Sequence, residues 1–332
     1  MVIQDLSKPL NVEKEIKLYS GSGNRELAQK IADRLGLTLS GLKLEKFANG
    51  ETYARFDESV RGDEVFIIQC IAGENVNDLL MELLIITDAA KRASAASVTA
   101  VITHYAYARQ DRKAASREPI TARLVANLLE TAGIDRVITL DLHQSQIQGF
   151  FDIPVTHLTA LYLFGDYFRK KDFDWENTVV VSPDAGRAKH AKKLSDYLGC
   201  SLAIAHKGRP KHNVAEVMSL IGDIKGKTCI INDDMIDTAG TLCGSMNELK
   251  RQGAGDIYVC ATHGIFSGPA ISRLQEAPIE ECVVTDAIPC YMADRPGSKI
   301  KTISVADELA EAIHHVYVNE PTTAIFGGDL NL

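Results

Sequence analysis

Apolar runs that suit buried strands alternate with amphipathic segments along most of the chain. Residues 23–36 and 186–199 each place apolar side chains at i, i+3, i+4 and i+7, which is the spacing of one helix face. Residues 61–70 and 225–234 each pass through a glycine turn into a β-branched apolar run, which is typical of a buried strand. This alternation predicts an α/β fold with mostly parallel sheets and helices on both faces.

The same segments recur in the two halves of the chain. Residues 91–104 match residues 250–263, and residues 133–141 match residues 278–286, in the order set by the two pairs above. Four matches in one order indicate two homologous α/β domains. We therefore expect an N-terminal domain over residues 1–158 and a C-terminal domain over residues 159–332.

Polar residues follow several of the apolar runs directly. In parallel α/β sheets ligands bind beyond the carboxyl ends of the strands, so these residues are the first functional candidates. They are Asp233, Asp184, His143 and His104. For His104 a structural role and a functional role remain equally open.

The clearest chemical motif lies between a predicted strand and a predicted helix in the second half. The turn Asp237-Thr238-Ala239-Gly240-Thr241 combines free backbone N–H groups at a helix start with hydroxyl donors, which predicts a phosphate site. Asp233 and Asp234 would repel that phosphate, so we expect them to accept hydrogen bonds from a diol or to hold Mg²⁺. A phosphate beside a diol indicates a pentose phosphate.

Composition narrows the class of partner. The chain has 332 residues, 36 Lys and Arg against 44 Asp and Glu, and a net charge of −8, which argues against non-specific nucleic-acid binding. No run approaches the roughly 18 apolar residues of a membrane span. The seven cysteines form no CxxC pair and no signal peptide is visible. We expect a cytoplasmic protein that binds small molecules, not nucleic acid or membranes.

Residues 233–241 resemble the 5-phosphoribosyl 1-diphosphate signature of type I phosphoribosyltransferases. The longer segments YARQDRKAASREPITARLVANLLETAG, LDLHQSQIQGFFDIPV and VVVSPDAGRAKHAKKL are similar to ribose-phosphate pyrophosphokinases of the phosphate-dependent class. The resemblance runs from about Leu18 to Ala312. It implies two tandem type I phosphoribosyltransferase-like (Rossmann-like) domains. It also implies transfer of the diphosphoryl group of Mg-ATP to the 1-hydroxyl of ribose 5-phosphate, giving 5-phosphoribosyl 1-diphosphate and AMP.

The resemblance assigns residues to both substrates. The ATP-binding positions are Phe47, Asn49, Gly50, Glu51, Arg109 and Gln110. Asn49 stands where many relatives carry Asp, and an amide can both donate to and accept from adenine. The ribose 5-phosphate positions are Asp233, Asp234, Asp237, Thr238, Ala239, Gly240 and Thr241.

Metal binding and catalysis are assigned to further segments. His143 and Asp184 match the family's Mg²⁺ positions, with Mn²⁺ as an alternative metal. Lys207 and Arg209 match its mobile catalytic loop, where cations meet the charge that develops on the transferred group. Arg187 stands where relatives usually have glycine, and its side chain could obstruct the turn or point outward and add a cation.

Regulation and assembly complete what the resemblance implies. Ser59, Arg61 and Ser304 match positions that bind activating inorganic phosphate and inhibiting ADP between subunits, although a role at a strand edge on the surface is nearly as well supported. Family members form hexamers, so we expect a homo-oligomer.

Two rival functions remain to be weighed. A non-catalytic regulatory subunit would keep the fold, but Lys207, Arg209, His143 and Asp184 argue for retained activity. A phosphoribosyltransferase that consumes the diphosphate product would need only one such domain and a base-binding hood. The duplicated domain favours synthesis over consumption.

Overall fold

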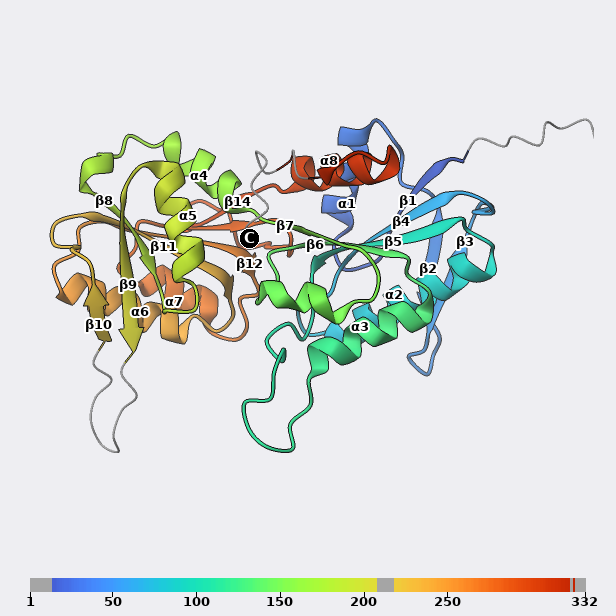
Figure 1. Ribbon diagram of the computed structural model, residues 1–332, viewed down its shortest axis with the longest axis horizontal. Coiled ribbons are helices and arrows are strands. Elements are labelled where there is room, and N and C mark those ends of the chain that lie inside the picture. The colour runs from blue at the N-terminus through green and yellow to red at the C-terminus, as the bar shows by residue number, and fades with distance from the viewer. Residues whose placement is uncertain (1–13, 208–217, 323–324, 326–332) are drawn as a thin grey trace, which may run out of the picture.

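A computed structural model describes residues 14–207, 218–322 and 325, and Figure 1 shows its two large sheets. The predicted α/β class with two mostly parallel sheets is confirmed. No helix within the described ranges is both long and apolar enough to cross a bilayer.

The first sheet is parallel throughout. Its strands lie in the order β1 (Ile16–Ser20), β4 (Glu64–Cys70), β5 (Ser97–His104), β6 (Arg136–Leu140) and β7 (Val155–Leu158). The helices in this half are α1 (Arg25–Leu35), α2 (Val76–Arg92) and α3 (Thr121–Ala132), and a short 3₁₀ segment, η1, covers Ser145–Phe150. A separate antiparallel hairpin joins β2 (Leu42–Lys46) to β3 (Thr52–Phe56).

The second sheet has the same plan with two strands added at one edge. Its order is β10 (Met218–Ile221), β9 (Ser201–Lys207), β8 (Thr178–Ser182), β11 (Thr228–Ile236), β12 (Ile257–Gly264), β13 (Glu281–Thr285) and β14 (Ile300–Ile303). Of these strands, β10 is antiparallel to its neighbour. The 3₁₀ segment η2 (Trp175–Asn177) precedes β8, and the helices are α5 (Ala188–Leu198), α6 (Gly240–Arg251) and α7 (Ala270–Glu276).

The segments that match in sequence occupy equivalent places in the two sheets. The order β1-β4-β5-β6-β7 in the first half corresponds to β8-β11-β12-β13-β14 in the second. Helices α1 and α5 both end at a left-handed glycine, Gly36 with φ 67° and Gly199 with φ 72°, a conformation that a side chain would strain. The internal repeat read from the sequence is therefore a repeat of structure.

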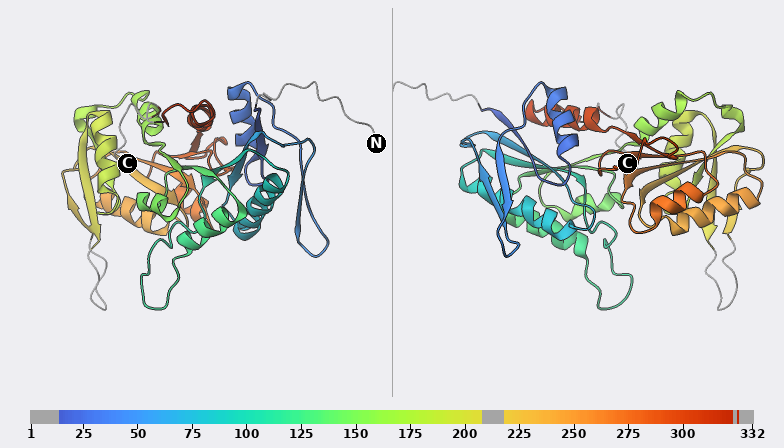
Figure 2. Two further views of the ribbon diagram at one scale, coloured as in Figure 1. Left: turned by 45° about the vertical axis from the view of Figure 1, so that its right-hand side comes forward. Right: turned by 180° about the vertical axis from the view of Figure 1, so that it is seen from behind.

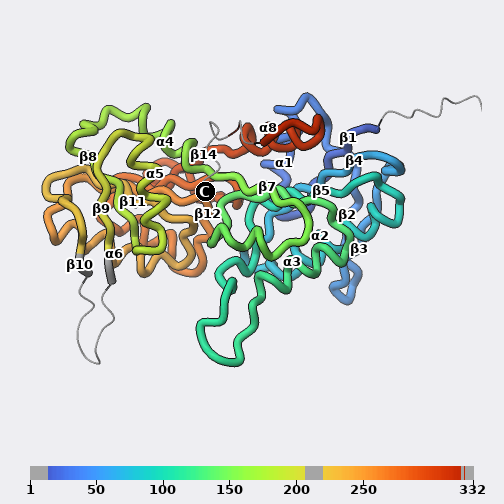
Figure 3. Tube along the Cα trace, viewed as in Figure 1, coloured from blue at the N-terminus to red at the C-terminus, as the bar shows by residue number. Residues whose placement is uncertain are grey.

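The helix that follows the last strand of each sheet packs on a helix of the other sheet. Helix α4 (Leu161–Arg169) follows the last strand of the first sheet and packs on α5, whereas α8 (Ala306–Tyr317) follows the last strand of the second sheet and packs on α1. Figure 3 shows α8 beside α1. Leu309 and Ile313 of α8 share one buried core with Leu27. The division between domains at residue 158 stays a prediction, since this core runs through both halves.

The carboxyl ends of the central strands face one another where the halves meet. The rings of His104 and His263 lie 4.8 Å apart in an edge-to-face arrangement. Thr262 Oγ1 donates to Asp141 Oδ2 at 2.6 Å, and Asn24 Nδ2 donates to the carbonyl oxygen of Asp286 at 2.7 Å. Because ligands bind at these strand ends, the contact brings candidate groups from both halves together.

Candidate active site

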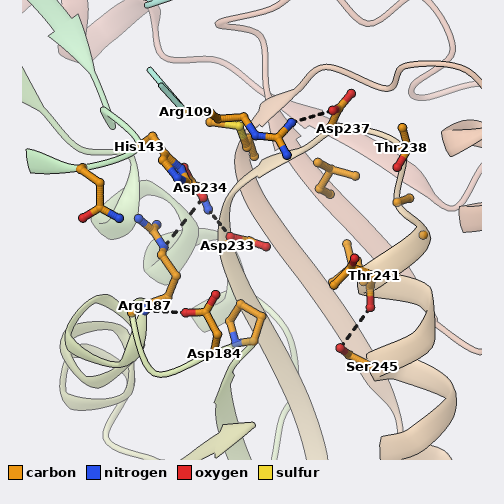
Figure 4. A pocket seen from close by; sticks show the side chains of 18 of the residues that line it. Arg109, His143, Asp184, Arg187, Asp233, Asp234, Asp237, Thr238, Thr241 and Ser245 are labelled. Atoms are coloured by element: carbon orange, nitrogen blue, oxygen red, sulfur yellow. Dashed lines mark hydrogen bonds and ion pairs between the residues drawn. The ribbon is translucent and has the colours of Figure 1, made fainter. Parts of the chain in front are cut away.

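A cavity of about 480 Å³ opens beyond the carboxyl end of β11. Arg109 and His143 reach it from the first half, and Asp184, Asp233 and Thr241 reach it from the second. Figure 4 shows these side chains around the cavity. The structure thus brings together groups that are separated by more than one hundred residues of sequence.

The predicted phosphate turn forms one wall of this cavity. Ala239 adopts a left-handed conformation with φ 57° and immediately precedes α6, and no side-chain cap is present at that helix start among the described residues. Arg273 Nη1 donates to the carbonyl oxygen of Thr238 at 2.9 Å and so holds the turn from outside. Gly240 and Thr241 line the cavity, and an uncapped helix start there favours an anion.

The acidic pair lies on the floor beside the turn. Asp234 is only 2% exposed, its Oδ2 is 2.7 Å from His143 Nδ1, and its backbone N–H donates to Asp233 Oδ1 at 2.9 Å. Burial opposes charge on Asp234, but the hydrogen bond with His143 and the charge of Arg187 together lower its pKa. Burial and the charge of Asp234 raise the pKa of Asp233. The pKa values of these two adjacent carboxyl groups are therefore shifted in opposite directions.

The hydrogen bond between His143 and Asp234 also affects the imidazole of His143. The hydrogen bond to Asp234 raises the pKa of His143 despite the opposing effect of burial. His143 is thereby held in a fixed orientation at the cavity wall.

The donor atoms fit a divalent cation that a substrate carries. Over the described ranges, no three His, Cys, Asp or Glu side chains converge closely enough to hold a metal by themselves. Asp184, Asp233 and His143 nevertheless line the cavity, and carboxylate oxygens are the ligands that Mg²⁺ prefers. A cation with most of its ligands from phosphate oxygens would fit this arrangement.

Arg109 stands between this cavity and a smaller one. Its Nη1 is 2.7 Å from Asp237 Oδ2, which links the ATP-binding candidate to the phosphate turn. The neighbouring cavity, about 260 Å³, is also lined by Arg109 and Gln110 and has apolar walls that include Val76 and Met235. One ligand can therefore place a charged part in the large cavity and an apolar part in the small one.

The predicted adenine loop lies elsewhere. Phe47, Asn49, Gly50 and Glu51 form the tip of the β2–β3 hairpin, where the Glu51 N–H donates to Asn49 Oδ1 at 3.2 Å. Phe47 is 55% exposed, and none of the four lines either cavity. Figure 2 shows the hairpin standing out from the body of the protein. Within one chain, the structure does not bring this loop to Arg109.

The catalytic and regulatory candidates are also spread out. Lys207 is the last residue of β9, while Arg209 lies outside the described residues. Ser59 and Arg61 follow β3 and form a local turn in which the Arg61 N–H donates to Ser59 Oγ at 3.3 Å. Ser304 follows β14 and donates from Oγ to Asp286 Oδ2 at 2.7 Å. The catalytic role of Lys207 and Arg209 therefore stays a prediction. So does the regulatory role of Ser59, Arg61 and Ser304.

The remaining strand-end histidine is buried. His104 Nδ1 lies 2.8 Å from the carbonyl oxygen of Ile71, and the ring also borders the small cavity. Burial lowers the pKa of His104 to about 3.

Two arginines at the site had no assigned role in the sequence. Arg112 lines the large cavity, and Arg273 holds the turn. The only signal for either residue was its place in the stretch from about Leu18 to Ala312 that resembles the family.

Comparison with known proteins identifies the family. Residues 16–133 match the N-terminal domain of ribose phosphate pyrophosphokinase, and residues 207–327 match the phosphoribosyl synthetase-associated domain. The chain is 49% identical to the ribose-phosphate pyrophosphokinase of Clostridium acetobutylicum, over 96% of this chain and 99% of that protein. It is 51% identical to that of Staphylococcus haemolyticus, over 94% and 97%.

A solved structure agrees. The phosphoribosylpyrophosphate synthetase of Mycobacterium smegmatis aligns with a TM-score of 0.87 at 46% identity, covering 92% of this chain and all of that chain. Identity at this level over almost the full length, together with the cavity built from both halves, leads to one conclusion: the chain belongs to the ribose-phosphate pyrophosphokinase family.

Proposed function

We propose that this protein transfers the diphosphoryl group of Mg-ATP to the 1-hydroxyl of ribose 5-phosphate, giving 5-phosphoribosyl 1-diphosphate and AMP for nucleotide, histidine and tryptophan biosynthesis. The observation that carries the proposal is the large cavity, in which an uncapped helix start lies beside a pair of carboxyl groups. An anion site next to hydrogen-bond acceptors suits a sugar phosphate with free hydroxyls. Membership of the family supports the same reaction.

Ribose 5-phosphate would lie along the wall made by residues 237–241. Its phosphate accepts hydrogen bonds from the first N–H groups of α6 and from the hydroxyls of Thr238 and Thr241. Its ring hydroxyls then reach Asp233, which lines the same cavity. This orientation leaves the 1-hydroxyl free to attack phosphorus in the open part of the cavity.

ATP would enter from the side of Arg109. Arg109 and Arg112 both line the large cavity and present guanidinium groups to its phosphates, while Gln110 borders the apolar cavity next to it. Mg²⁺, or Mn²⁺ in its place, would neutralise phosphate charge next to Asp184 and His143. Lys207 and Arg209 would meet the charge on the transferred group when their loop covers the site.

A second copy of the chain would complete the nucleotide site. Phe47 is exposed at the tip of a hairpin that lines neither cavity, so the adenine contacts assigned to residues 47–51 need a neighbouring subunit. We propose a homo-oligomer, a hexamer by its family resemblance, that belongs to the phosphate-dependent class and works in the cytoplasm. Inorganic phosphate would activate it between subunits through Ser59, Arg61 and Ser304.

The test is AMP formation by the purified protein. With ATP and Mg²⁺, AMP should appear only when ribose 5-phosphate is present, and added inorganic phosphate should raise the rate. Each reaction is paired with one that contains ribose but no 5-phosphate, because the helix start at α6 should recognise the phosphate. Failure to form AMP by folded protein that binds ATP would refute the proposal and favour a non-catalytic subunit.

A further inference from the structure

Arg187 places a buried guanidinium group in the wall of the large cavity. The residue immediately precedes α5, and its backbone N–H donates to Asp184 Oδ1 at 3.0 Å. The side chain is only 10% exposed. Figure 4 shows it turned toward Asp234, not outward to solvent. Of the two orientations that the sequence left open, the structure thus has the inward one.

Arg187 and Asp234 form a buried ion pair. Arg187 Nε lies 4.0 Å from Asp234 Oδ1, and this nitrogen has no hydrogen-bond partner among the described residues. Because an isolated buried charge is costly, the two groups stabilise each other in the absence of any ligand. The second oxygen of Asp234 is already 2.7 Å from His143. The most buried carboxylate of the site therefore has both oxygens next to groups of the protein.

A cation fixed at this position changes what the site can bind. A divalent metal ion that approached Asp234 would meet the positive charge of Arg187 a few ångströms away, and like charges at that range repel strongly where solvent is scarce. Asp184 is also engaged, because it accepts the backbone N–H of Arg187. The guanidinium group would attract phosphate oxygens for the same reason that it repels a metal.

We propose that Arg187 is the resident counter-ion of Asp234, so that the ligand-free protein binds divalent cations weakly and takes its metal together with the nucleotide phosphates. This inference rests on the proposed function, which supplies the metal–nucleotide substrate. It goes beyond that function in assigning to Arg187 control over the order in which metal and nucleotide bind. Arg187 acts through Asp234 and is a positioning residue.

The experiment measures Mn²⁺ binding to nucleotide-free protein from the electron paramagnetic resonance signal of unbound Mn²⁺. In R187M an uncharged side chain of similar length replaces the guanidinium, and R187K keeps the positive charge. K189M removes a charge from an exposed position two residues along the chain and serves as the matched control. We expect R187M to bind Mn²⁺ at least about tenfold more tightly than the unchanged protein. R187K and K189M should bind Mn²⁺ about as weakly as the unchanged protein.

Unchanged or weaker Mn²⁺ binding by R187M would overturn the inference. Circular dichroism checks that R187M is folded, and R187Q, which keeps hydrogen-bonding capacity, replaces it if it is not. The unchanged protein gives an independent reading: the inference expects a dissociation constant of about 1 mM or weaker, and one in the micromolar range contradicts it. AMP formation is assayed separately, so loss of the proposed activity and failure of this inference give different results.

Discussion

Lowering the pH should destabilise this protein through His104, which is buried at the contact between its two halves. Burial, and next the charge of nearby His263, lower the pKa of His104 from 6.5 to about 3. The unfolded chain therefore binds a proton below pH 6.5 that the folded protein does not accept. Stability falls as pH drops below 6.5, and this contribution has no effect well above that value.

The size of the effect follows from the pKa shift. At pH 5 the unfolded imidazole is about 1.5 pH units below its pKa of 6.5, while the folded one remains neutral. At about 1.4 kcal/mol per unit, His104 alone lowers the free energy of unfolding by about 2 kcal/mol relative to pH 7. Burial lowers the pKa values of His157 and His263 as well, which adds to the loss, whereas the raised pKa values of His143 and Asp233 act in the opposite direction. The contribution of His104 is therefore measured as a difference between variants.

The variant H104N isolates the contribution. An asparagine amide can donate to the carbonyl oxygen of Ile71, as His104 Nδ1 is placed to do, but it does not titrate. Urea unfolding followed by circular dichroism at pH 7 and pH 5 should show that H104N loses about 2 kcal/mol less than the unchanged protein. H314N, on the exposed face of α8, is the control and should keep the original pH dependence. Equal pH dependence in H104N and the unchanged protein would refute the reasoning.

Substitutions at three further positions test the site and the fold. T241V removes a hydroxyl of the phosphate turn, and it should raise KM for ribose 5-phosphate at least about tenfold with little change in kcat, measured by AMP release. E82A should lower the free energy of unfolding by about 3 to 5 kcal/mol in urea, because it leaves one donor of Gln69 and two of Ser22 without an acceptor. E82Q should cost less than half as much, since its amide can donate to the Ser22 hydroxyl. F47A should leave stability within about 0.5 kcal/mol but weaken ATP binding about tenfold in calorimetry, because Phe47 is exposed and free to stack on a base; unchanged ATP affinity would contradict its assignment.

Much of the fold was readable because its signals are local. Periodicity over ten to fifteen residues predicted the helices α1 and α5, and β-branched runs predicted β4 and β11. The order of the repeated segments then predicted two sheets of the same plan, which the strand orders confirm. The turn over residues 237–241 was equally predictable, because its residues are contiguous and its conformation depends on the start of α6, while its phosphate-binding role stays a prediction.

Contacts between distant segments were decided by the tertiary structure alone. No pattern in the sequence showed that α4 packs on α5 and α8 on α1. Nor did any pattern show that the hairpin tip with Phe47 stands away from both cavities, or that Arg273 holds the carbonyl of Thr238. These arrangements depend on which buried surfaces complement each other over long sequence separations, and helix or strand periodicity carries no record of that.

Arg187 shows the division most clearly. The sequence by itself determined that a charged side chain occupies the turn before α5, in a segment that forms part of the site. Whether that side chain faced solvent or the cavity depended on Asp234, which lies on another strand and offers a buried opposite charge. Residue type and local pattern thus determined the elements and the available chemistry, whereas the pairing of buried groups across the two halves determined how that chemistry is arranged.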